Sequence, residues 1–300
     1  MTDQTHVSFI GAGKIGSALA LLVSRSGAFI EQWDVDASKV PNQKSLEDVV
    51  SSSDVLFFCV PSWVLSDAIK TIIPFLRRKT LCVFVSKGIE AKSKLFIDGF
   101  AKQCLPKNQP IVLLSGPMLA EELEAGLGGA ACVATKSISD FKKIQEIFSP
   151  KDLSLTFAPD TKSVAIAGVL KNVYAIAYGI SSGLKWGDNK KGWLCVEVVQ
   201  EMISITAKLK GDPSYVLSQA GLGDLIATGS SKYSSNHAFG RSLVVDVHSE
   251  RKGEGCTALP SLLKLLGPQT VKSVPILSAL ERIIQKKKNA KEEFEKLFCR

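Results

Sequence analysis

Three glycines near the start of the chain constrain the fold more than any other feature of the sequence. Gly11, Gly13 and Gly16 directly follow the apolar segment 7–10, and small and apolar residues at 17–23 continue with helical spacing. In Rossmann-type domains such a loop joins a strand to a helix, because the glycines permit a tight turn, a close approach of pyrophosphate and close helix packing. The helix N-terminus then binds the phosphates. We predict dinucleotide contacts from Gly11, Gly13, Lys14, Ile15 and Gly16.

The end of the next apolar segment indicates which dinucleotide is bound. Asp34 follows segment 28–33, about 20 residues past the glycines, where a carboxylate can accept a hydrogen bond from the ribose 2′-hydroxyl of NAD. The carboxylate would repel a 2′-phosphate, and the neighbours Val35 and Asp36 offer no arginine. We therefore expect NAD(H) as the cofactor and NADP(H) as the runner-up.

Apolar segments alternate with helical patterns over the first 160 residues. The strands are expected at 5–10, 28–33, 55–60, 81–86, 111–115, 130–135 and 153–157. This alternation predicts an α/β fold with a parallel, doubly wound sheet. After Pro159 and Asp160 the apolar residues recur at helical spacing only. The sequence therefore predicts a Rossmann domain at 1–160 and an all-helical substrate and catalytic domain at 161–300.

Composition excludes several other classes of protein. The 300 residues are 45% hydrophobic and 22% charged, as in soluble globular proteins. Apolar runs such as 55–60 and 111–114 are shorter than the roughly 20 residues that span a bilayer, and no secretory leader is apparent, so we expect no membrane contact and a cytoplasmic location. The net charge of +8 is scattered rather than interleaved with aromatic residues, which favours a small anionic substrate over nucleic acid.

The cysteines and histidines do not form a pattern typical of metal sites. Seven cysteines are widely spaced without a Cys-x-x-Cys pair, and the three histidines are not clustered. Cys59, Cys82 and Cys132 lie in strand-like runs, where a thiol acts as a small buried hydrophobe. We expect reduced thiols and no metal.

Two lysines and one proline are candidates for chemistry. Lys87 follows the fourth expected strand, at the sheet edge where ligands bind in such folds. Lys171 lies in the apolar stretch 164–176, where an unpaired ammonium would be costly to bury, so its side chain either snorkels to solvent or serves a site. Pro61, after the third strand, is either a contact on the nicotinamide side or simply a strand-ending turn.

Six segments, in order, resemble the NAD(P)-dependent glycerol-3-phosphate dehydrogenases, within the 6-phosphogluconate-dehydrogenase-like superfamily. The resemblance extends over nearly the whole chain. Its segments are 86–90 (SKGIE), 114–122 (LSGPMLAEE), 170–173 (LKNV), 187–189 (GDN), 220–225 (AGLGDL) and 253–255 (GEG).

The resemblance implies a role for each matching residue. Lys171 is the implied general acid and base, Lys87 and Asn172 position and polarise the substrate, and Asp224 orients the site. The implied cofactor contacts include Pro61, Lys87, Ala120 and Glu254, and the implied substrate contacts are Lys87, Asn172, Asp224, Thr228, Ser235 and Asn236. An ammonium suits this chemistry, because hydride addition to a ketone builds negative charge on oxygen that needs a proton or a cation.

The chain departs from the family where the substrate phosphate is bound. The family's Ser-Arg-Asn is Ser-Ser-Asn at 234–236, and the uncharged Ser235 cannot replace a bidentate guanidinium. Either another basic residue compensates or the substrate is not a phosphate. The candidates are Lys232, His237 and Arg241 nearby and Arg251 farther along the chain. Glu197 and Val198 also replace an arginine and a glycine, and Met118 and Leu119 replace a serine and a phenylalanine.

The sequence thus predicts an NAD-dependent glycerol-3-phosphate dehydrogenase of glycerophospholipid metabolism, which transfers hydride reversibly between NAD(H) and dihydroxyacetone phosphate or glycerol 3-phosphate. One alternative is a related dehydrogenase for another small hydroxy or keto compound. Another is a regulator that binds NAD(H) without turnover. A homodimer is an open alternative to a monomer.

Overall fold

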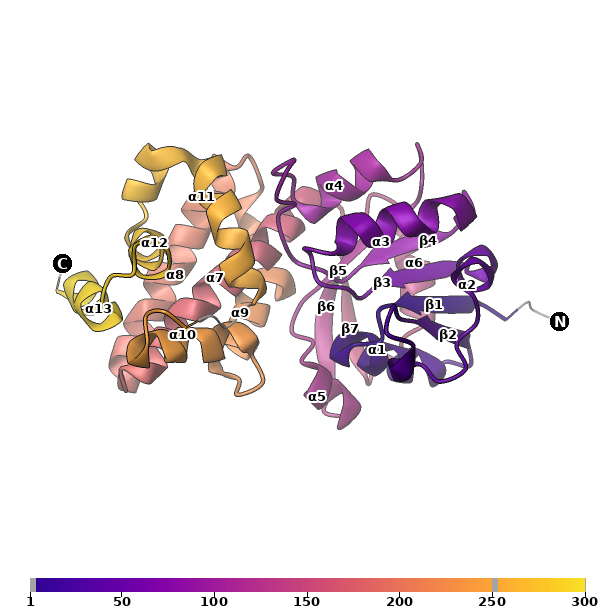
Figure 1. Ribbon diagram of the computed structural model, residues 1–300, viewed down its shortest axis with the longest axis horizontal. Coiled ribbons are helices and arrows are strands. Elements are labelled where there is room, and N and C mark those ends of the chain that lie inside the picture. Colours follow the sequence, from indigo (N-terminus) through magenta and orange to yellow (C-terminus); the bar gives the residue numbers. More distant parts are fainter. Residues whose placement is uncertain (1–3, 250–252, 300) are drawn as a thin grey trace. The chain divides into compact units, whose positions relative to one another are not determined.

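The chain forms two compact units, residues 1–165 and 166–300. The computed structural model describes residues 4–249 and 253–299 (Figure 1). The division falls inside helix α7 (Thr161–Gly183), whereas the sequence predicted a boundary at residue 160.

The first unit is built on a seven-stranded sheet, counted over the described residues, in the order β2-β1-β3-β4-β5-β6-β7. The strands are β1 (His6–Ile10), β2 (Phe29–Trp33), β3 (Val55–Phe58), β4 (Leu81–Phe84), β5 (Ile111–Ser115), β6 (Gly129–Ala134) and β7 (Leu153–Ala158). The chain moves from β1 outward to β2 and then back past β1 to β3. Such a reversal creates a crevice at the carboxyl ends of β1 and β3, where doubly wound sheets bind their ligands.

The sheet is mostly parallel, as the sequence predicted, but it departs from this order at one edge. Strand β6 pairs antiparallel with β5, and β7 pairs parallel with β6. Parallel strands need a long crossover that covers one face of the sheet, whereas antiparallel strands can be joined by a chain that folds straight back. Residues 116–128 make this return, and Gly116 lies so close to β6 that a Cβ there would lie 2.3 Å from the carbonyl oxygen of Ala130.

Helices cover both faces of the sheet in the first unit. They are α1 (Lys14–Ser24), α2 (Leu46–Ser52), α3 (Leu65–Ile72), α4 (Ile97–Cys104), α5 (Ala120–Glu124) and α6 (Ile138–Glu146), with short 3₁₀ turns η1 (Ala37–Lys39) and η2 (Ile73–Phe75). Strands β3 and β4 are buried at every position, as expected for parallel strands covered on both faces. Phe57 and Phe58 point to opposite faces and stack on Phe9 and Phe84, with ring centroids 4.7 and 4.6 Å apart.

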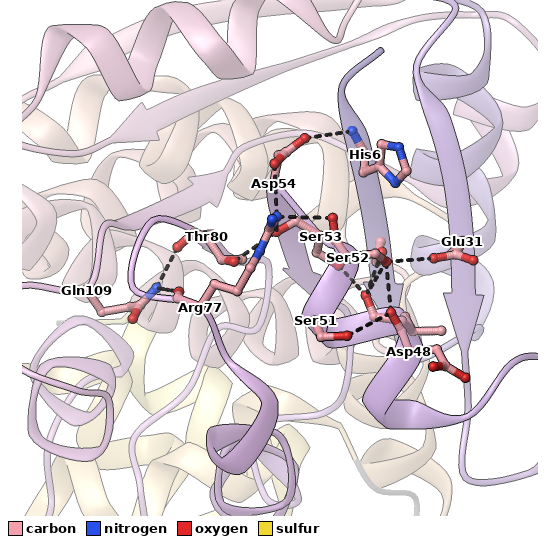
Figure 2. A network of polar contacts seen from close by, with 12 residues as sticks. His6, Glu31, Asp48, Ser51, Ser52, Ser53, Asp54, Arg77, Thr80 and Gln109 are labelled. Carbon is pink, nitrogen blue, oxygen red and sulfur yellow. Dashed lines mark hydrogen bonds and ion pairs between the residues drawn. The ribbon is translucent and has the colours of Figure 1, made fainter. Parts of the chain in front are cut away.

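A polar network joins the segments that lead into the central strands (Figure 2). Arg77 donates to the Asp54 carboxylate (2.9 Å), which also accepts from the backbone N–H of His6 (3.1 Å). The Gln109 amide donates to the backbone carbonyl oxygens of Arg77 (3.0 Å) and Thr80 (2.6 Å). These bonds tie together the amino-terminal ends of β1, β3, β4 and β5, away from the loops that follow these strands.

The second unit is helical in its described residues, which confirms the prediction for this half of the chain. Besides most of α7, its helices are α8 (Asp188–Lys208), α9 (Asp224–Ser230), α10 (Ser235–Val245), α11 (Glu254–Lys272), α12 (Pro275–Lys286) and α13 (Ala290–Phe298). A 3₁₀ turn, η3 (Pro213–Leu217), and a π-helical turn, η4 (Gln219–Gly223), precede α9.

Helix α7 is both long and apolar. By length and composition it could span a membrane, which the shorter apolar runs of the sequence did not suggest, but 89% of its most apolar window is buried. A helix that is apolar on all sides is also typical of a protein core. Tyr174, Val173 and Ile176 of α7 are fully buried.

Glycines let two other helices approach the backbone of α7. A Cβ on Gly179 would lie 2.1 Å from the carbonyl oxygen of His237, and a Cβ on Gly240 would lie 2.1 Å from that of Ile176. At the start of α11, a Cβ on Gly255 would lie 2.2 Å from the carbonyl oxygen of Asn172. Helices α10 and α11 are thus seated directly on α7.

Candidate functional site

The glycine loop after β1 leaves its backbone open at one position. Gly11 has φ +100°, and a Cβ there would lie 2.9 Å from Val60, in the turn after β3. A Cβ on Gly16 would lie 2.0 Å from the carbonyl oxygen of Gly11, so this position has no room for a side chain. A Cβ on Gly13, in contrast, would meet no atom within 4 Å. The loop is therefore tight around Gly11 and Gly16 and open where a ligand would approach Gly13.

The N-terminus of α1 offers donors to that opening. Its N-cap, Gly13, makes no side-chain capping bond to the first-turn N–H groups. Uncapped N–H groups and the helix dipole favour an anion at this end of the helix. Lys14 is exposed and forms an ion pair with Glu121 (2.6 Å), Ile15 is partly covered, and Ala120 is buried at the start of α5.

Asp34 is buried beside this loop and keeps a charged carboxylate. Its Oδ2 accepts from the backbone N–H of Ala12 (2.9 Å), and its Oδ1 accepts from the backbone N–H of Asp36 (2.9 Å) and from the Lys39 ammonium (3.1 Å). Burial alone would raise the pKa of Asp34, but these three donors together hold it below its usual value. Since a carboxylate has about four acceptor sites, it retains capacity for a ribose hydroxyl.

Lys39 is a residue that the sequence analysis missed. It is five positions beyond Asp34, outside the immediate neighbours Val35 and Asp36. The available signal was that Lys39 is the first basic residue after the second strand.

Pro61 and Lys87 lie in loops at the carboxyl ends of β3 and β4. Ser86 donates to the carbonyl oxygen of Val60 (2.5 Å), and the Lys87 ammonium donates to that of Gly116 (3.3 Å). The loops after β3, β4 and β5 are therefore joined at one edge of the sheet. An open glycine loop, an uncapped helix N-terminus and a charged Asp34 fit a bound dinucleotide.

In the second unit, Lys171 is held in a buried ion pair. Its ammonium lies 3.0 Å from Asp224 Oδ1 and donates to Thr228 Oγ1 (2.9 Å), and the Thr228 hydroxyl donates to Asp224 Oδ1 (3.0 Å). Asp224 and Thr228 are one turn apart on α9, so both face Lys171. The side chains of Lys171 and Asp224 are only 7% and 3% exposed. Lys171 thus has a buried partner and does not snorkel to solvent.

Asn172, the next residue of α7, is oriented by a second set of contacts. The Asn236 amide group donates to Asn172 Oδ1 (2.9 Å), while Asn236 Oδ1 accepts from the backbone N–H of Gly255 (3.0 Å). Because the oxygen of Asn172 is the acceptor in this chain of bonds, its NH₂ group faces away from Asn236. Lys171 and Asn172 are therefore consecutive residues of α7, the first oriented by α9 and the second by α10.

Ser235 and Glu254 begin the two helices that meet near Asn172. Ser235 is the exposed first residue of α10, and Glu254 is the partly covered first residue of α11. A Cβ on Gly253 would lie 3.3 Å from Ser235 Oγ, so the two helix starts are in contact. The structure thus brings the predicted second-unit residues to the middle of α7.

Two of the basic residues considered as substitutes for the missing arginine lie away from Lys171. His237 is buried against Ser182 (3.0 Å between Nε2 and Oγ), and Ser182 is eleven residues beyond Lys171, about 16 Å along the helix. The backbone of Arg241 packs beside the next residue, Gly183. Lys232 is exposed just before α10. Arg251 lies outside the described residues.

No group of three potential metal ligands from histidine, cysteine, aspartate or glutamate occurs in residues 4–249 and 253–299. All seven cysteines are unpaired, and Cys59, Cys82 and Cys132 are buried as expected. Burial raises the pKa of the Cys82 thiol to about 12, which keeps it protonated.

Comparison with protein families gives two matches. The model described as the N-terminus of NAD-dependent glycerol-3-phosphate dehydrogenase matches residues 37–140, and the model described as its C-terminus matches residues 160–295. The chain is 31% identical over 314 residues to the glycerol-3-phosphate dehydrogenase (NAD(P)+) of Clostridium tetani, covering 95% of this chain and 89% of the relative. It is 30% identical over 325 residues to that of Bacillus subtilis, covering 98% and 94%.

Solved structures show the same fold. Glycerol-3-phosphate dehydrogenase from Coxiella burnetii matches with a TM-score of 0.89 at 24% identity, covering 99% of each chain. The enzyme from Plasmodium falciparum matches with a TM-score of 0.85 at 17% identity, covering 97% of this chain and 94% of that one.

Proposed function

Because the chain belongs to the NAD-dependent glycerol-3-phosphate dehydrogenase family, we propose that it transfers hydride reversibly between NAD(H) and dihydroxyacetone phosphate or glycerol 3-phosphate, in the cytoplasm. The observation that carries the proposal is the buried Lys171–Asp224–Thr228 group, with Asn172 as the next residue of α7. In this proposal the Lys171 ammonium is the proton donor to the substrate oxygen, and the Asn172 amide is a hydrogen-bond donor to the same atom.

The first unit binds the dinucleotide in this proposal. The backbone at Gly13 and the first turn of α1 hold the pyrophosphate, and the Asp34 carboxylate accepts a hydrogen bond from the adenosine ribose. Pro61 and Lys87 contact the nicotinamide side. When bound, the nicotinamide supplies or accepts the hydride.

The second unit handles the proton. Lys171 gives a proton to the substrate oxygen during reduction and takes it back during oxidation, and Asn172 donates a hydrogen bond to the same oxygen. Asp224 and Thr228 orient the ammonium, because each contacts it directly. Ser235 and Asn236 lie on the phosphate side of the substrate.

The test is oxidation of NADH on addition of dihydroxyacetone phosphate, followed by absorbance. Lys171→Ala should lower kcat by about 100 to 10,000-fold, as is typical for loss of a general acid, while NADH still binds. Lys208→Ala, which removes an exposed lysine at the end of α8, is the matched control and should keep full activity. Equal turnover in the Lys171→Ala protein would rule out the proposed role.

The exposed Ser235 favours a second candidate, a dehydrogenase for another small hydroxy or keto compound. Without a guanidinium at this position, the contact to a phosphate is weaker than in the family. A panel of small ketones tested for NADH consumption separates the two candidates, and a preferred substrate without phosphate would establish the second.

A further inference from the structure

The Asp34 carboxylate carries its own counter-ion. The Lys39 ammonium lies 3.1 Å from Asp34 Oδ1, and the two side chains are 45% and 8% exposed respectively. The carboxylate is thus fixed and buried, whereas the ammonium reaches it from the solvent side. A ligand group that arrives at Asp34 from solvent also meets Lys39.

The backbone around this pair is held firmly. The Asp34 backbone N–H donates to Gln43 Oε1, and the Gln43 amide donates to the Asp34 carbonyl oxygen, both at 3.0 Å. Asp36 caps the η1 turn by accepting from the backbone N–H (3.2 Å) and the hydroxyl (2.6 Å) of Ser38. The Lys39 backbone N–H donates to the Asp36 carbonyl oxygen (3.1 Å). The base of the Lys39 side chain is therefore fixed, and its four-carbon stem supplies the movement.

We propose that Lys39 is the residue that binds the 2′-phosphate of NADP(H), so that the Asp34–Lys39 pair lets one site accept both dinucleotides. The proposal rests on the dinucleotide site of the proposed function. With NAD(H), Lys39 stays on Asp34 while the carboxylate accepts from the ribose hydroxyl. With NADP(H), the ammonium turns from the carboxylate to the phosphate.

The charges of Asp34 and Lys39 determine which dinucleotide binds more tightly. A carboxylate beside the 2′ position repels a phosphate, and a cation nearby compensates for that repulsion. A lysine suits this exchange because its ammonium is a point charge on a flexible stem. Since Asp34 remains charged, NAD(H) stays the preferred cofactor and NADP(H) binds more weakly.

Calorimetric dissociation constants for NAD+ and NADP+ test the proposal without reference to turnover. The measured quantity is the ratio of the dissociation constant for NADP+ to that for NAD+. In Lys39→Ala this ratio should rise at least about tenfold, the usual scale for loss of a charged hydrogen bond. Lys39→Arg should keep this ratio within about threefold of the original protein, because a guanidinium also binds phosphate.

Lys44→Ala is the matched control. Lys44 forms an ion pair with Glu31 of β2 at 2.5 Å, so its removal changes the net charge equally without touching Asp34. The control should change the ratio by less than about twofold. Lys39→Gln serves as a second variant if thermal melting shows that Lys39→Ala is misfolded.

Three outcomes overturn the proposal. They are a ratio in Lys39→Ala within about twofold of the original, an equal change in Lys44→Ala, and no binding of NADP+ to the original protein. Binding of both dinucleotides without turnover of any ketone would instead reject the proposed reaction and leave this inference in place.

Discussion

Asp224 both neutralises the buried ammonium of Lys171 and orients it. A buried ion pair that loses one partner leaves an uncompensated charge, which typically costs about 3–5 kcal/mol. Asp224→Asn keeps the side-chain volume and removes the negative charge. We expect a lower free energy of unfolding by about that amount, measured by urea denaturation, together with reduced kcat.

Thr228→Val is the companion variant for this prediction. It removes the hydroxyl between Lys171 and Asp224 but keeps the ion pair, so its loss of stability should be smaller, about 1–3 kcal/mol. If Thr228→Val lowered the free energy of unfolding more than Asp224→Asn does, the charge of Asp224 would not be the main stabilising partner of Lys171.

Lys232 is the remaining basic residue, among those considered and described, that can serve the phosphate side of the substrate. It is exposed and precedes Ser235 by three residues, at the end of α10 that lies near Asn172. Lys232→Ala should raise the KM for dihydroxyacetone phosphate about tenfold and leave the KM for NADH unchanged, as steady-state kinetics can show. An unchanged KM for dihydroxyacetone phosphate would show that Lys232 does not bind the substrate phosphate.

The contact of α10 with α7 depends on the absence of side chains. A Cβ on Gly240 would overlap the backbone of α7, and backbone atoms cannot move aside as the end of a side chain can. Gly240→Ala should lower the free energy of unfolding by about 1–3 kcal/mol or more.

Gly192, in the exposed part of α8, is the matched control for Gly240. A Cβ there would meet no atom within 4 Å. Gly192→Ala should raise the free energy of unfolding by about 0.5–1 kcal/mol, because alanine favours the helix. Thermal melts of both variants should therefore shift in opposite directions, and a shift in the same direction would contradict the packing argument.

The same helix contact makes stability depend on pH. Burial, and then the positive charges of Arg241 and Lys191, lower the pKa of His237 below its usual 6.5. As the pH falls, the unfolded chain takes up this proton before the folded chain does, so the stability present above pH 6.5 is lost as the pH falls through the folded pKa.

The pH effect can be isolated with one variant. His237→Gln keeps a polar group toward Ser182 but does not titrate in this range. Between about pH 7.5 and 5.5 the free energy of unfolding should fall more in the original protein than in His237→Gln. Parallel curves for the two proteins would assign the pH dependence to other groups.

At the scale of the whole molecule, cofactor binding should leave a local trace in the first unit. Hydrogen exchange with and without NADH should show added protection at the backbone around Gly13, Asp34 and Pro61. Binding also adds stability by mass action, about 2.7 kcal/mol at a ligand concentration of 100 times Kd. Protection confined to residues 166–300 would contradict the assignment of the dinucleotide to the first unit.

The fold was predictable where local patterns determine it. Each expected strand exists. Buried strands such as β3 and β4 are short apolar runs, and the intervening helices have their own period. The direction of β6 was not predictable, because the apolar pattern of a strand does not show which way the chain runs through the sheet.

The candidate site shows the same limit. Motif order identified Lys171, Asn172 and Asp224 as candidates, and their roles stay predictions. The sequence could not show that Asn236 reaches Asn172, or that Lys39 returns to Asp34, because each contact depends on where a loop places a long or distant side chain.

The network of Asp54, Arg77 and Gln109 (Figure 2) is built at the amino-terminal ends of the central strands, whereas the candidate dinucleotide site of the first unit is at their carboxyl ends. For protein engineering, this separates two design problems. Substitutions that strengthen or rigidify that end can be screened for heat resistance alone, since they leave the loops at the other end untouched. The thermal stability of an enzyme built on this scaffold can therefore be raised first, and its substrate specificity can be changed afterwards.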